Sequence, residues 1–102
     1  MITHIVLFKL KDESAESIEK AKNTLMDMDG KIPELKGIEV GVDITHSNRS
    51  YNLALITKFD SLESLEAYQI NPLHVGVSKY MVSVSASIVA VDFKSSQAFV
   101  NM

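Results

Sequence analysis

Three side chains of this 102-residue sequence could share acid–base chemistry: His4, Tyr68 and His74. Imidazole titrates near neutral pH, so His74 could act as a base that abstracts an acidic C–H or phenolic proton. The Tyr68 hydroxyl could act as the acid and donate a hydrogen bond to a developing enolate oxygen. Tyr68 and His74 stand on either side of an Asn71–Pro72 break, which brings both into one short stretch.

A structural role is the alternative for each of these three groups. His74 could brace the chain after Pro72, and Tyr68 could pack on the core with its hydroxyl in water. His4 shares a strand face with Val6, which favours a buried histidine bonded to a carbonyl group. The residue types alone leave both interpretations open.

Metal, thiol and cofactor chemistry find no support in the sequence. The spacing of His4, His46 and His74 fits no recognised ligand pattern, and no carboxylate cluster accompanies them. His46 lies in a polar loop and is expected to be solvated. The sequence has no cysteine, which excludes disulfides and thiolate ligands. We therefore expect no metal site and no cofactor.

Composition argues against nucleic acid and membrane as partners. The net charge is −3, and the lysines are scattered rather than gathered in a basic stripe. The apolar run at the N-terminus lacks a preceding basic segment, and Lys9 leaves it too short for a membrane-spanning helix. Hydrophobic residues at 46% and charged residues at 23% are ordinary for a globular domain. We expect one soluble, cytoplasmic domain.

Four segments have the composition of β-strands. They are Ile2–Leu10, Leu35–Asp43, Tyr51–Phe59 and Ser85–Phe93. The first and third are apolar on both faces, which predicts that both are covered on two sides and that Ile2–Leu10 is central in its sheet. The second alternates between apolar and polar residues, so it is expected to be half-exposed.

The remaining segments have helical spacing. A helix over Ala15–Lys31 is predicted from apolar residues three and four apart, with Asp12 or Ser14 as its cap. Asp60, with Glu63 three residues on, is expected to cap a second helix. The Asn71–Pro72 pair ends that helix, and a further helical segment is expected over Leu73–Val82.

The predicted order is β-α-β-β-α-β, an α+β, ferredoxin-like arrangement with a four-stranded antiparallel sheet. The helices of its two α units can cover only one face of such a sheet. The other face would expose apolar side chains from several strands, and soluble monomers rarely leave a large apolar patch open. A second copy could bury it through an isologous two-fold contact that closes a barrel. The faces of the strands therefore predict a homodimer.

The sequence also resembles the stress-responsive A/B barrel domain (Dabb) family of the dimeric α+β barrel superfamily. The segments that carry this resemblance are 4–9, 32–33, 40–43, 59–65 with Tyr68, Pro72 and His74, and 91–93. The resemblance implies a Dabb domain over residues 1–95, followed by a C-terminal tail, 96–102. It also implies a homodimer and a cleft between sheet and helices.

One family member, a plant polyketide cyclase, uses the tyrosine and the final histidine of a Tyr-x-x-His-Pro-x-His stretch. The resemblance carries these roles to Tyr68 and His74, and it matches a first-strand histidine to His4. Asn71 stands in place of the first histidine of that stretch, and Leu53 in place of a third-strand histidine. The first helix offers no aromatic residues where the cyclase lines its pocket with them.

Three hypotheses for function follow, and whether the protein is an enzyme stays open. The first is a homodimeric Dabb-type barrel that binds a small apolar or phenolic molecule in the cleft. Its polar contacts would be His4, Tyr68 and His74. The walls of the cleft would be Val6, Phe8, Leu25, Leu55 and Val77. The second is a polyketide-cyclase-like or cofactor-free monooxygenase-like enzyme with His74 as base and Tyr68 as acid. The third is a purely structural stress protein.

Overall fold

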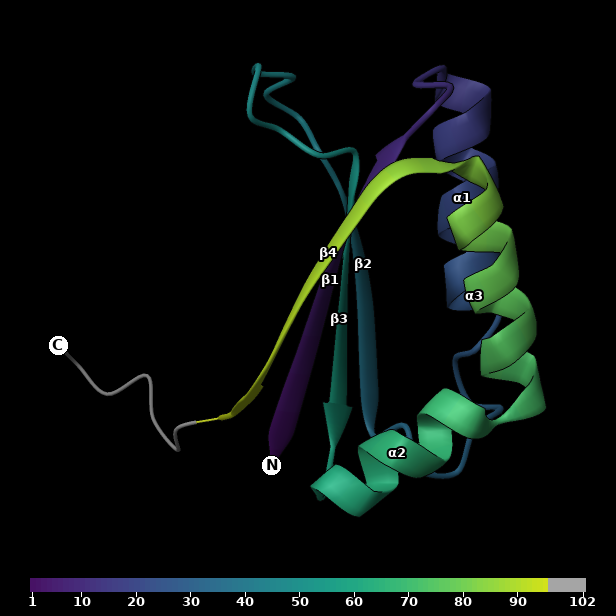
Figure 1. The fold of residues 1–102 in the computed structure, drawn as a ribbon, viewed down its shortest axis with the longest axis vertical. Helices are drawn as coiled ribbons and strands as arrows, with labels where there is room; N and C mark the ends of the chain where they lie inside the picture. Colours follow the sequence, from purple (N-terminus) through teal and green to yellow (C-terminus); the bar gives the residue numbers. More distant parts are fainter. Residues whose placement is uncertain (96–102) are drawn as a thin grey trace, which may run out of the picture.

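A four-stranded antiparallel sheet and three helices on one of its faces make up residues 1–95, the part of the chain that the computed structural model describes (Figure 1). The strand order is β2-β3-β1-β4. The elements are β1 (Ile2–Leu10), α1 (Ala15–Met26), β2 (Gly37–Val42), β3 (Leu53–Phe59), α2 (Leu62–Ile70), α3 (Pro72–Val84) and β4 (Ser85–Lys94). The predicted ferredoxin-like fold is confirmed, and β1 and β3 are the central strands. The predicted tail, 96–102, lies outside the described residues.

The first helix ends earlier than its apolar spacing predicts. α1 stops at Met26, and residues 27–31 form turns in which Met28 N–H donates to Leu25 O and Lys31 N–H donates to Met28 O. Gly30 adopts a positive φ of 74°, a conformation that glycine enters without steric cost. The prediction of a helix as far as Lys31 is wrong because these tighter turns replace the α-helical hydrogen bonds after Met26, although Met28 stays buried.

The caps of α2 and α3 set the position of the candidate histidine. Ser61, not Asp60, caps α2, because its side chain accepts a hydrogen bond from Ser64 N–H. Asn71 ends α2 and also caps α3, where its Oδ1 accepts from Leu73 N–H at 2.9 Å. Pro72 occupies the first position of α3, where a missing N–H costs nothing. The Asn71–Pro72 pair therefore both breaks one helix and starts the next.

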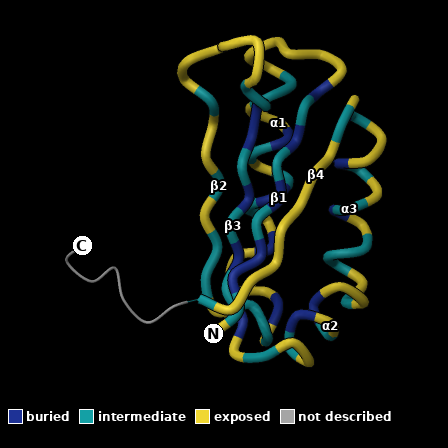
Figure 2. Tube along the Cα trace, turned by 60° about the vertical axis from the view of Figure 1, so that its left-hand side comes forward, coloured by how far each residue is buried: buried dark blue, intermediate teal, exposed yellow. Residues whose placement is uncertain are grey.

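The two faces of the sheet differ in what covers them (Figure 2). Alternate residues of β1 and β3 point toward the helices and are buried: His4, Val6, Phe8, Leu10, Leu53, Leu55, Thr57 and Phe59. The strand registers place another set of side chains together on the opposite, open face: Ile5, Leu7, Ala54, Ile56, Val89, Val91 and Phe93. Val91 is 53% exposed, so the single chain leaves this apolar face uncovered.

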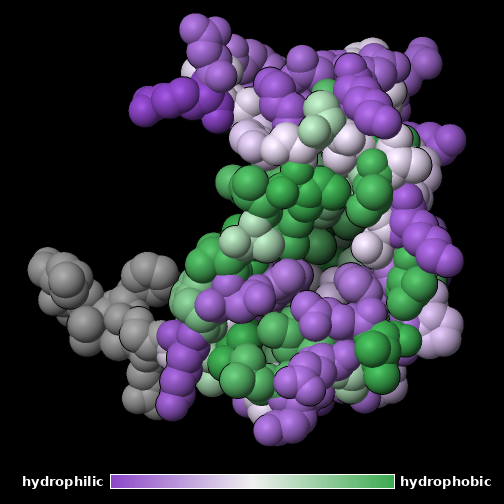
Figure 3. Space-filling model, viewed as in Figure 1, coloured by the Kyte–Doolittle hydropathy of each residue, from purple (hydrophilic) through white to green (hydrophobic). Residues whose placement is uncertain are grey.

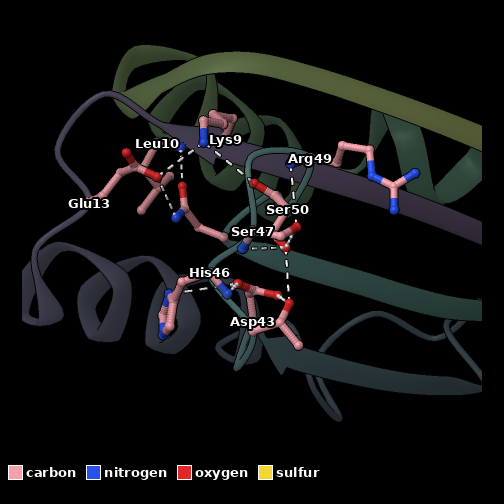
Figure 4. A network of polar contacts seen from close by, with 10 residues as sticks. Lys9, Leu10, Glu13, Asp43, His46, Ser47, Arg49 and Ser50 are labelled. Carbon is pink, nitrogen blue, oxygen red and sulfur yellow. Dashed lines mark hydrogen bonds and ion pairs between the residues drawn. The ribbon is translucent and has the colours of Figure 1, made fainter.

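A polar network ties the end of β1 to the loop between β2 and β3 (Figure 4). Asn52 lies at its buried end: its Oδ1 accepts from Leu10 N–H at 2.7 Å, and its Nδ2 donates to Glu13 Oε2 at 2.9 Å. Glu13 also accepts from Lys9 Nζ at 3.3 Å. Asn52 therefore satisfies a backbone donor of β1 and a carboxylate at the same time.

Asn52→Leu is expected to destabilise the fold by about 2–3 kcal/mol, because it leaves the buried Leu10 N–H without an acceptor. Urea unfolding should show a lower midpoint with an unchanged slope. Asn48→Leu, in the exposed part of the same loop, is the matched control and should change stability by about 0.5 kcal/mol or less. Equal midpoints for the two variants would contradict the role given to Asn52.

Candidate functional site

A cavity of about 260 Å³ lies between the sheet and the helices. Its rim includes Val82 of α3 and Ile88 of β4, both of which are exposed, while Leu25 and Met81 lie deep in it and are buried. All eight predicted site residues line it: His4, Val6, Phe8, Leu25, Leu55, Tyr68, His74 and Val77. The structure therefore brings the predicted polar contacts and walls to one place. Their roles in binding or catalysis stay predictions.

His74 lies in the first turn of α3 and braces the junction with α2. Its Nδ1 donates a hydrogen bond to the Gln69 carbonyl oxygen at 3.1 Å. This bond fixes the tautomer and leaves a lone pair on Nε2, which makes no hydrogen bond to any residue within 1–95. Burial lowers the pKa of His74 from its ordinary value, although the bond to Gln69 opposes that shift. The lowered pKa favours the neutral imidazole, in which Nε2 is a free acceptor.

Tyr68 is fully buried, and its ring packs between the two cavity histidines. Its centroid lies 4.3 Å from that of His74 and 6.3 Å from that of His4. The hydroxyl donates to Met28 Sδ at 3.7 Å, so the expectation of a hydroxyl in water is wrong. Sulfur is a weak acceptor, and a ligand oxygen would be a better partner for this donor. Burial raises the pKa of Tyr68, which keeps the hydroxyl protonated.

His4 is buried, as its strand face predicts, but its partner is not a carbonyl group. Its Nδ1 bonds to the Asp92 carboxylate, which stands directly opposite on β4. The prediction of a carbonyl partner is wrong because the register of β1 and β4 places a carboxylate beside the ring. The second ring nitrogen, Nε2, has no protein partner among the described residues.

Several residues line the cavity in addition to the eight that the sequence predicts. They are Met28, Gln69, Ser78, Met81, Val82, Ile88 and Ala90. The four-residue spacing of His74, Ser78 and Val82 is a sequence signal that places them on one face of α3. Asp92 was also missed as the partner of His4, and only the pairing of β1 with β4 reveals it.

Two other kinds of site find no support in the described residues. Within 1–95 there is no group of three or more histidine, aspartate or glutamate residues that could hold a metal ion. None of the helices in this part of the chain is both long and apolar enough to cross a membrane. His46 lies exposed in its loop, apart from the other two histidines.

The depressed pKa of His74 predicts a pH dependence of stability. The unfolded chain binds a proton at this residue below about pH 6.5, whereas the folded chain resists it. His74 therefore contributes stability above that pH, and the contribution is lost as pH falls through the folded pKa. Urea unfolding between pH 7.5 and 5.5 should show a smaller loss for His74→Gln than for the unchanged protein. Equal losses would contradict the burial of a neutral imidazole.

The family follows from comparison with known proteins. Residues 2–95 match the family model of the "Stress responsive A/B Barrel Domain". The chain belongs to the stress-responsive A/B barrel domain family. This assignment confirms the resemblance that the sequence segments indicate, and it spans all elements of the described fold.

Three similar proteins illustrate the range of this A/B barrel family. Olivetolic acid cyclase of Cannabis sativa is 32% identical over 78 residues, which cover 74% of this chain and 77% of the cyclase. The stress-response A/B barrel domain-containing protein DABB1 of Arabidopsis thaliana is 32% identical over 103 residues; the match covers 96% of this chain but only 49% of DABB1. A solved structure from Bacteroides fragilis, described as a dimeric protein of unknown function with a ferredoxin-like fold, has a TM-score of 0.76 and 31% identity, and covers 91% of this chain and 94% of its own.

Proposed function

We propose that this A/B barrel protein is a homodimer that binds a small, largely apolar molecule carrying one polar group in the cavity between sheet and helices. The observation that supports this most directly is the composition of the cavity. Aliphatic and aromatic walls surround one cluster of donors and acceptors formed by His4, Tyr68 and His74. Ligand sites in proteins have this character: mostly apolar, with a few convergent polar groups.

The size of the cavity limits the ligand. Its volume of about 260 Å³ lies below the ~300–1,000 Å³ of pockets that enclose drug-sized molecules. The donor of Tyr68 and the free Nε2 atoms of both histidines suit a ligand with a hydroxyl or carbonyl oxygen. A phenol or enol with a short apolar substituent fits both conditions.

The open face of the sheet supports the homodimer. Figure 3 shows an apolar patch in the middle of one side of the molecule, over β4 and beside α3. Val89, Val91 and Phe93 contribute exposed apolar surface on β4. The Bacteroides fragilis relative, with the same fold, is described as dimeric. Light scattering at micromolar concentration should therefore give about twice the 11.3 kDa chain mass.

Thermal unfolding with matched ligands tests the binding proposal. 3-Propylphenol at about 100 times its dissociation constant should stabilise the protein by about 2.7 kcal/mol, which is a rise of roughly 10 °C or more. Propylbenzene, which lacks the hydroxyl, should give a much smaller rise. If no member of a series of short alkylphenols raises the unfolding temperature, the cavity is not a ligand site, and the purely structural role gains support.

An acid–base enzyme is the second candidate. The free Nε2 of His74 beside the Tyr68 ring, and the similarity to olivetolic acid cyclase, favour it. In this case His74 would remove a proton from the substrate, and Tyr68 would turn its hydroxyl from Met28 to the developing oxyanion. His74→Ala separates the two candidates. An enzyme should lose turnover while it keeps most of its binding, whereas a binding protein has no turnover to lose.

A further inference from the structure

The two cavity histidines have different partners, and this difference assigns them different chemistry. We propose that His4, oriented by Asp92, accepts the proton of an acidic hydroxyl group, phenol or enol, on the molecule bound in the cavity. The proposal rests on the proposed function and names the class of ligand and the group that ionises it. Asp92 acts through His4 and is a positioning residue.

The tautomer of His4 follows from its bond to Asp92. A carboxylate oxygen can only accept a hydrogen bond, so Nδ1 of His4 carries the hydrogen. In the neutral ring the lone pair then lies on Nε2. The ring lines the cavity, and no described residue bonds to Nε2. His4 therefore offers the cavity a proton acceptor that the protein itself does not occupy.

His74 has the same tautomer but a poorer partner for positive charge. Its Nδ1 donates to a backbone carbonyl, which offers only a dipole, whereas His4 donates to a full negative charge. A carboxylate next to an imidazole stabilises the imidazolium that forms on proton uptake. The partner of Nδ1 therefore assigns proton uptake to His4 rather than to His74.

The proton transfer from the ligand to His4 needs no other reactant. The O–H bond of the ligand breaks, an Nε2–H bond forms on His4, and the electron pair stays on the ligand oxygen. The resulting oxyanion lies beside an imidazolium whose Nδ1–H remains on the Asp92 carboxylate. The His74 and Tyr68 rings line the same cavity, and the Tyr68 hydroxyl could turn from Met28 to donate to that oxygen.

4-Nitrophenol tests this step because its phenolate absorbs visible light and its neutral form does not. The measurement is made at a pH where the free phenol is mostly neutral, with protein in excess. The unchanged protein should raise the phenolate fraction of the bound probe. Asp92→Asn keeps an acceptor for His4 but removes the charge, and should lower the phenolate-to-phenol ratio of the bound probe about tenfold or more. His4→Gln should remove the phenolate signal.

Asp29→Asn makes the same chemical change at an exposed position outside the cavity and should leave the ratio unchanged. Saturable binding without phenolate in the unchanged protein would overturn the role of His4 but not the proposed function. Loss of the phenolate signal in His74→Gln, with retention in Asp92→Asn, would also overturn it and would assign the proton to His74.

Nitrogen NMR of the ligand-free protein gives an independent result if 4-nitrophenol fails to bind, an outcome that counts against the proposed function. The ring nitrogens of His4 should show the Nδ1–H tautomer, and Asp92→Ala should abolish that preference while His74 keeps its own. An Nε2–H tautomer at His4 in the unchanged protein would overturn the inference.

Discussion

Val91→Asp should convert the proposed homodimer into a folded monomer. Val91 lies in the middle of β4 on the open face of the sheet, with Ile5 of β1 as its cross-strand neighbour. Burial of an unpaired carboxylate costs several kcal/mol, and a two-fold contact would bury two of them. We therefore expect the dimer dissociation constant to rise about a thousandfold or more, since about 4 kcal/mol corresponds to that factor. Light scattering over a range of concentrations measures it.

Ile70→Asp is the matched control for this prediction. Ile70 is also an exposed branched residue, but it ends α2 on the helical side of the sheet. This variant should remain dimeric and folded by circular dichroism. A dimeric Val91→Asp protein would show that the open face is not the interface.

Val77→Phe is expected to weaken the proposed ligand binding without unfolding the protein. Val77 is buried on α3 and faces the cavity, so the larger ring has an empty volume to enter rather than a packed core to displace. The added atoms would fill much of the space beside Phe8 and Leu25. Affinity for 3-propylphenol should fall at least about tenfold, which requires a loss of only ~1.4 kcal/mol. Calorimetric titration measures the change.

Val75→Phe places the same bulk on α3 at a residue that does not line the cavity. It should bind the probe like the unchanged protein. If Val77→Phe also binds normally, the ligand does not occupy this cavity.

The periodicity of the sequence predicts most of the fold because burial follows the alternation of residues in the two central strands, β1 and β3. His4, Val6 and Phe8 alternate with Ile5 and Leu7, and the two sets lie on opposite faces of the sheet. The predicted strands end within two residues of β1 to β4. The predicted site residues lie together because one face of α3 and the inward face of β1 line the same cavity.

The features that the sequence does not predict depend mainly on contacts between residues that are distant in the chain. In the sequence alone, Asp92 is an ordinary polar residue of the last strand. Its bond to His4 follows from the register of β4 with β1, which the sequence does not give. The cap of α2 is Ser61, one residue after the predicted Asp60, because both side chains can accept from a free backbone N–H. Met28 lines the cavity from the turns after α1; its spacing from Leu25 predicts that it is buried but not that it contacts the cavity.

Methyl NMR of the cavity between sheet and helices tests the central claim most directly. The methyl groups of Val6, Leu25, Leu55, Val77 and Met81 report on the cavity, and those of Ile44 and Ile70 report on exposed surface away from it. Titration with 3-propylphenol should shift the cavity methyl signals in a saturable manner and leave those of Ile44 and Ile70 unchanged. Saturable shifts at other positions, or no saturable shift with any short alkylphenol, would contradict a ligand site between the sheet and the helices.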